Sequence, residues 1–119
     1  MKLLASGFST AETTFASRQA STGYGAGKSM TVRRVVAMCG GTTVAANSSG
    51  GMNVVFGMSS DALESTLTFP TPKSADATSG GSAAAAQWEL EGLSIQCGFV
   101  EARTNEAANG GWSVFIFGD

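Results

Sequence analysis

WELEGLSIQCGF, at residues 88–99, is the stretch of sequence that decides the fold. Apolar and polar residues alternate in it, from Trp88 to Glu91 and then, one residue out of phase, from Leu93 to Phe99. Strict alternation places apolar side chains on one face of a β-strand and polar ones on the other, because successive side chains of a strand point to opposite faces. Gly92 stands where the phase changes, which predicts either a glycine bulge inside one long strand or a very tight hairpin.

Further strand-like segments lie on both sides of this stretch. Residues 30–39 are rich in β-branched side chains and end at a glycine pair. Residues 112–117 are almost entirely apolar, which predicts a strand buried on both faces by a neighbouring layer or by another subunit. Shorter segments at 42–46, 52–58 and 66–69 are separated by turn sequences. The pattern predicts a single all-β domain, a β-sandwich or a barrel-like fold of about 7–9 short strands.

Gly, Ser, Thr and Ala together make up 61 of the 119 residues, and charged residues make up only 13%. Val, Ile, Leu and Phe account for 23 residues, a small number for a core of this size, so we expect subunit association to supply part of the buried area. The length suits one domain. The chain contains no run of about 20 apolar residues that would span a membrane, and its first residues do not resemble a signal peptide.

The first 29 residues differ in character from the rest, because they are small and polar and hold few large apolar side chains. We expect an N-terminal strand and a flexible, extended N-terminal arm over 1–29, followed by a β-domain over 30–119. A low-complexity loop over 73–85 is long enough to be either mobile or ordered by a partner. The net charge is +4 over 1–34 and −6 over 35–119, which would allow a basic arm to pair with an acidic neighbour. Ordinary solvated charge is the favoured interpretation, because exposed ion pairs contribute little.

Several motifs resemble chemical sites, but each has a simpler structural interpretation. Residues 22–29, TGYGAGKS, end like a phosphate-binding loop, but the first position is Thr22 and a strand rather than a helix follows, so a glycine hinge is favoured. Glu89 and Glu91, with Glu101 nearby in the chain, could form the carboxylate pair of a glycosidase. The favoured interpretation is that Glu89 and Glu91 lie on the solvent face of a strand, because they are two residues apart. With no histidine in the chain, a Ser-His-Asp triad is excluded.

The two cysteines, Cys39 and Cys97, lie in separate apolar segments and form no CxxC motif. A long-range disulfide and two buried free thiols are both open, and the second is favoured in the absence of a secretion signal. Two cysteines without histidine do not suit zinc. We therefore expect no enzyme activity, no catalytic residue, no cofactor and no metal. Basic and aromatic residues do not interleave, so we expect no nucleic-acid partner.

A β-rich chain of this composition, without histidine or catalytic signatures, resembles the small virion structural proteins of tailed bacteriophages, and among them the capsid decoration or cement type. The resemblance covers composition and strand pattern. It implies a β-sandwich or barrel that forms symmetric homo-oligomers, such as trimers, and stabilises the phage head by binding the major capsid protein. It also implies a virion location after synthesis in the host cytoplasm, with no membrane partner.

Candidate interaction residues are Arg33 and Arg34 in the basic part of the chain, and Trp112, Phe115 and Phe117 in the last strand-like segment. The aromatic side chains are either core residues or, where exposed, contact residues. The alternative function is a carbohydrate- or receptor-binding β-domain, such as a fibre tip or a lectin-like module. In that case stacking rings and hydrogen-bonding groups would come from Tyr24, Trp88, Trp112, Asn53, Asp61 and Asn109.

Overall fold

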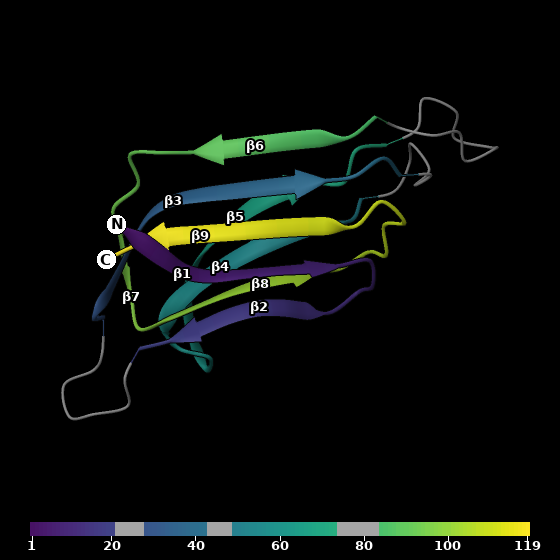
Figure 1. Ribbon diagram of the computed structural model, residues 1–119. Helices are drawn as coiled ribbons and strands as arrows, with labels where there is room; N and C mark the ends of the chain where they lie inside the picture. The colour runs from purple at the N-terminus through teal and green to yellow at the C-terminus, as the bar shows by residue number, and fades with distance from the viewer. Residues whose placement is uncertain (21–27, 43–48, 74–83) are drawn as a thin grey trace.

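The computed structural model describes residues 1–20, 28–42, 49–73 and 84–119. In these ranges the chain forms nine strands and no helix (Figure 1). The strands are β1 (Lys2–Ser9), β2 (Thr14–Gln19), β3 (Met30–Cys39), β4 (Gly51–Ser59), β5 (Ala62–Pro70), β6 (Ala86–Leu90), β7 (Ile95–Cys97), β8 (Phe99–Thr104) and β9 (Trp112–Gly118). The prediction of an all-β chain with a β-sandwich fold is confirmed.

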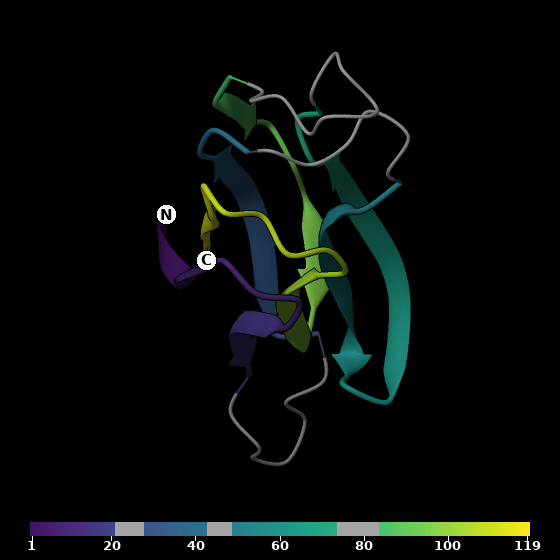
Figure 2. The ribbon, with the colours of Figure 1, turned by 90° about the vertical axis from the view of Figure 1, so that its right-hand side faces the viewer.

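The strands form two antiparallel sheets that pack face to face. Sheet A has the order β1-β9-β3-β6, with β7 also paired to β3, and sheet B has the order β2-β8-β4-β5. Figure 2 shows the layers side by side, with β3 and β9 on one side and the β4–β5 hairpin on the other. Each sheet therefore has an inner face toward the other sheet and an outer face toward solvent.

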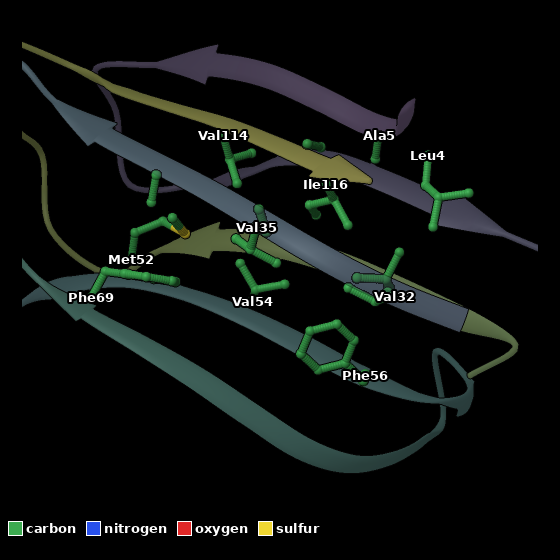
Figure 3. Packing of buried hydrophobic residues seen from close by; sticks show 14 of the residues in the cluster. Leu4, Ala5, Val32, Val35, Met52, Val54, Phe56, Phe69, Val114 and Ile116 are labelled. Carbon is green, nitrogen blue, oxygen red and sulfur yellow. The ribbon is translucent and has the colours of Figure 1, made fainter. Parts of the chain in front are cut away.

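The core lies between the two inner faces. Val32, Val35 and Ile116 of sheet A point toward Val54 and Phe56 of sheet B (Figure 3). All five side chains are at most 1% exposed. Alternation along each strand supplies these inner positions, because every second side chain faces the opposite sheet.

Most of the stretch at residues 88–99 lies along one edge of β3, as two short strands, β6 and β7, separated by residues 91–94. The phase change therefore falls in an interruption rather than in a bulge of one long strand, and Phe99 already begins β8 of sheet B. Leu90 in β6 lies opposite Val35, and Ile95 in β7 lies opposite Val32, so the edge contains two more residues than β3 between these pairs. Gly92, with φ of 71°, lies in the extra segment. Leu90 and Leu93 both pack against the core, which is what the phase change requires. The hairpin alternative is wrong, because β6 and β7 pair with β3 and not with each other.

Residues 1–20 belong to the sandwich rather than to an arm outside it. Strand β1 pairs with β9 in sheet A, strand β2 pairs with β8 in sheet B, and Leu4, Ala5 and Ala16 are core residues. An added Cβ at Gly7 would overlap the carbonyl oxygen of Phe15, so the two strands approach closely. This packing could not be predicted from the sequence, because the residues at the contact are small and give no apolar pattern. Residues 21–27 of the predicted arm, 43–46 of the predicted strand and 74–83 of the predicted loop lie outside the described residues.

Within one subunit, strand β9 is buried on its inner face, and burial of its outer face by another subunit stays a prediction. Its inner side chains, those of Trp112, Val114 and Ile116, are fully buried. Phe115 and Phe117 lie on the outer face of sheet A and are partly exposed. The reason is that sheet B covers sheet A from one side, whereas the outer side chains are flanked, within the described ranges, by neighbouring strands of the same sheet.

Cys39 and Cys97 are both buried and free, so the favoured arrangement of two free thiols is confirmed. Burial raises the pKa of both thiols, because the charged thiolate is poorly solvated there. The Cys39 Sγ donates a hydrogen bond of 3.4 Å to the carbonyl oxygen of Gly40. Both cysteines therefore act as small apolar residues of the core.

Substitution of two glycines compares the cost of a steric overlap with the cost of an unfavourable backbone conformation. We expect Gly57→Ala to lower the free energy of unfolding by about 2 kcal/mol or more, because its Cβ would overlap the Ala62 carbonyl oxygen across the β4–β5 pair. Gly92→Ala should cost about 1 kcal/mol, since only its left-handed conformation is unfavourable and its Cβ would meet nothing within 4 Å. Urea unfolding of both variants measures the difference. Equal losses would contradict this account of Gly57.

Candidate functional site

The candidate site is the outer face of sheet A, where large apolar side chains from three strands lie next to one another. Leu3 lies opposite Phe117, Ser6 opposite Phe115, and Phe8 opposite Ser113 in the β1–β9 pairing. Strand β3 adds Val36 and Met38 on the other side of β9. We call the following residues the apolar face: Leu3, Phe8, Val36, Met38, Phe115 and Phe117.

The apolar face is most exposed along β1, the edge strand. Phe8 is 61% exposed and Leu3 is 47% exposed, whereas Phe115 and Phe117 are partly covered by their neighbours and Val36 is buried. Contiguous apolar surface of this kind on a soluble domain marks a contact site more often than scattered single residues do. The structure therefore brings together two of the predicted interaction residues, Phe115 and Phe117, with two that the sequence did not single out, Leu3 and Phe8.

Arg34 connects the apolar face to a charged margin on β6. Its guanidinium carbon lies 5.5 Å from the centre of the Phe117 ring, within the range of a cation–π contact. Its Nη2 lies 3.2 Å from Glu89 Oε1, and its Nε lies 3.3 Å from Glu91 Oε1. The Nε is buried and makes no hydrogen bond within the described part of the chain. Arg34 thus covers an aromatic ring and pairs with two carboxylates at the boundary of the face.

Arg33 points elsewhere, although it is the next residue. The pairing of β3 with β9 shifts between Val32 and Arg34, and Arg33 occupies this irregularity as an exposed side chain. Its Nε donates a hydrogen bond of 3.1 Å to Asp119 Oδ2, and this bond holds the pKa of the Asp119 carboxyl below its ordinary value. Arg33 and Arg34 line a pocket of about 390 Å³ beside the Gly92 bulge, but only Arg34 contacts the apolar face.

Trp112 is a core residue and not a contact residue. Its side chain is 0% exposed, and its ring stacks on that of Trp88 with centroids 5.5 Å apart and planes 23° apart. Trp88 in turn meets Phe69 of sheet B at 5.9 Å. Side chains of a strand alternate between its two faces, so Trp112 and Phe115, which are three residues apart, face opposite sides of the sheet.

The residues of the carbohydrate-binding alternative do not form one site among the described residues. Trp112 is inaccessible, and Tyr24 lies outside the described residues. Asn53 lies near the start of β4, opposite Thr68, whereas Asp61 lies in the turn at the far end of the same hairpin. No stacking platform with adjacent hydrogen-bonding groups results from these positions.

The three glutamates considered as a catalytic set lie on opposite sides of the molecule. Glu89 and Glu91 belong to the margin of sheet A, where Arg34 pairs with both. Glu101 lies on the outer face of sheet B and is 8% exposed. Its Oε1 accepts hydrogen bonds from Thr14 Oγ1 at 2.6 Å and from Arg103 Nε at 3.0 Å. This buried polar cluster could not be predicted from the sequence, because Thr14 is far from Glu101 and Arg103 in the chain.

Of the residues that resemble a phosphate-binding loop, 22–27 lie outside the described residues. Lys28 forms an ion pair of 2.9 Å with Glu64, and β3 begins at Met30, so a strand follows the motif. A working phosphate-binding loop opens a helix whose first N–H groups bind the anion. The described end of this segment does not have that geometry.

The described ranges contain no group of three or more acidic or cysteine side chains placed to hold a metal ion. Within the same ranges no helix has the length and apolar character needed to cross a membrane. Comparison of the chain with protein-family models, with curated proteins and with solved structures finds no match.

Proposed function

We propose that this chain is a non-catalytic structural protein that forms a homo-oligomer through the apolar face of sheet A. The observation that carries the proposal is the exposure of Leu3 and Phe8 beside the partly exposed rings of Phe115 and Phe117. Full burial of a large apolar side chain contributes about 1.5–3 kcal/mol, so each half-exposed side chain still has about 1 kcal/mol to gain. A second copy of the chain provides an apolar surface of the same kind.

The charged margin supports a partner that is another copy of this chain. Arg34 contributes a positive charge and Glu89 and Glu91 contribute negative charges along one border of the face. A two-fold interface brings the same surface of both subunits together, so it requires a surface that complements itself. A margin whose Arg34 already pairs with Glu89 and Glu91 in each subunit can border such an interface without placing a row of like charges against its copy.

The contrast between the two sheets further supports association through sheet A. The centre of the outer face of sheet B holds Glu101, Arg103 and Asn53, which lie in register on β8 and β4. Glu101 and Arg103 bind each other there, so their hydrogen-bonding groups are satisfied within one subunit. A face with internally satisfied polar groups gains little from association, whereas an apolar face gains from removal of its surface from water.

We place the oligomer on the head of a tailed bacteriophage as a capsid decoration protein. The support for this setting is the composition, rich in small residues and without histidine, together with the β-sandwich fold. In this role the major capsid protein is the second partner, and the oligomer stabilises the lattice by adding contacts between capsid subunits.

The oligomeric state tests the first part of the proposal. Size-exclusion chromatography with light scattering on the full chain at about 100 µM should show more than one copy per particle, because even a weak interface with Kd near 1 µM is then occupied. A stable monomer at that concentration would overturn the homo-oligomer. Co-sedimentation with empty shells of the major capsid protein encoded in the same genome tests the setting, and an oligomer that stays in the supernatant would overturn it.

A further inference from the structure

A second feature lies at the end of the sandwich where β1 begins and β2 ends, beside the N and C labels in Figure 1. Lys2 lies opposite Gly118 in the β1–β9 pairing, and Gly118 alternates with the inner residues of β9. Arg18 lies opposite Val100, a core residue of β8. By register, both cationic residues belong to the inner-facing series of their strands, one in each sheet, but they lie at the open end of the sandwich and are exposed.

Among the described residues, neither Lys2 nor Arg18 takes part in an ion pair. The same holds for Lys73, whereas Lys28, Arg33, Arg34 and Arg103 each pair with a carboxylate. Two like charges that face one small space repel each other, and an anion between them removes that repulsion. The arrangement is thus more favourable with a negatively charged ligand than without one.

A small cavity lies between these two side chains. Its volume is about 160 Å³, and it is lined by Lys2, Leu4, Arg18, Ala20, Ser29, Met30 and Asp119. One water molecule occupies about 30 Å³ in the liquid, so the cavity holds a few waters or one small anion. Asp119 is the acidic group in this lining, and its carboxylate already accepts a hydrogen bond from Arg33.

We infer that this cavity binds a tetrahedral oxyanion of the phosphate class, held by the Arg18 guanidinium, the Lys2 ammonium and the Ser29 hydroxyl. The guanidinium presents two parallel N–H groups that match two oxygens of such an anion, and the ammonium acts as a compact point charge. The hydroxyl adds a third donor. The site is separate from the apolar face, so its test is independent of the proposed homo-oligomer.

A different role for Arg18 has to be distinguished from anion binding. Inward-pointing charges on edge strands also prevent the edge from pairing with other chains, and β2 is an edge strand of sheet B. An edge-protecting arginine would not require Lys2 opposite it and would not respond to phosphate. The experiment therefore measures anion binding directly rather than solubility.

The probe is inorganic phosphate, added to the ¹⁵N-labelled full chain at pH 7 and compared with sodium chloride at equal ionic strength. We expect saturable amide shifts at Ala20, Ser29 and Met30, with Kd on the order of millimolar for a partly exposed site. Arg18→Gln and Lys2→Gln should each raise Kd about tenfold, since each removes a charge-assisted contact. The matched control Lys73→Gln, which removes an exposed cation away from the cavity, should leave Kd unchanged.

Three results would overturn the inference. They are shifts that fail to saturate, shifts of equal size in chloride, and unchanged binding in both Arg18→Gln and Lys2→Gln. Acetate binding as tight as phosphate binding would overturn the preference for a tetrahedral anion. Glycerol phosphate distinguishes the source of the group: a phosphomonoester that binds like phosphate indicates a phosphoryl group on a larger molecule, whereas binding of inorganic phosphate alone indicates the free ion.

Discussion

Trp112→Ala is expected to lower the free energy of unfolding by about 3–5 kcal/mol, the usual range for loss of a large aromatic side chain from a core. Trp112 is the largest of the fully buried side chains and is 0% exposed. Its ring stacks on Trp88, which in turn meets Phe69 in the other sheet, so the substitution leaves a cavity and removes one member of an aromatic cluster that joins both layers.

Urea unfolding followed by circular dichroism measures this loss. Because small domains have a total stability of about 5–15 kcal/mol, the variant should unfold at a clearly lower urea concentration, with a similar slope if it remains two-state. Trp112→Phe is the matched control and should lose much less, since it retains an aromatic ring and part of the volume. A loss below about 1 kcal/mol for Trp112→Ala would show that the ring is not a core element.

The double substitution Leu3→Ser and Phe8→Ser is expected to dissociate the oligomer with little effect on the fold of one subunit. A two-fold interface contains each residue twice, so four apolar side chains lose about 1 kcal/mol each. The sum of about 4 kcal/mol corresponds to an increase of nearly a thousandfold in the dissociation constant. The subunit itself should keep its stability, because both side chains are about half exposed or more before association.

Sedimentation equilibrium over a range of concentrations gives the dissociation constant of each variant. Met58→Ser with Leu63→Ser is the matched control, since these residues are 51% and 39% exposed and lie at the β4–β5 hairpin, away from the apolar face. The control should associate like the original chain. If it dissociates while the Leu3 and Phe8 variant does not, the interface lies on the hairpin and not on sheet A.

The sequence predicted the elements that depend on local alternation. The change of phase at Gly92 correctly placed Leu90 and Leu93 on the core side, but it did not predict that residues 91–94 leave the strand. Alternation in the last strand separates Trp112 from Phe115 in the same way. An apolar composition does not reveal what covers each face of a strand, so burial of the outer face of β9 by another subunit stays a prediction.

The strand partners and much of the candidate site could not be predicted from the sequence. Ala16 and Gly7 carry no apolar signal, yet their small size lets β1 and β2 pack closely, and this contact depends on residues that only the fold brings together. Phe8 became part of the apolar face through its register with Ser113. Lys2 and Arg18 likewise come to line one cavity through two separate strand pairings, β1 with β9 and β2 with β8.

The position of β9 between β1 and β3 has a consequence for how the chain folds as it is synthesised. Among the described strands, β1 pairs with β9 alone, and Lys2 lies opposite Gly118. Strand β1 therefore remains without its partner until β9, more than 100 residues later in the chain, has been synthesised. Pairings over such long sequence separations make folding slow, on the order of milliseconds to seconds. During that interval the apolar residues of β1 are open to wrong partners, so synthesis on crowded polysomes should favour aggregation before native assembly begins.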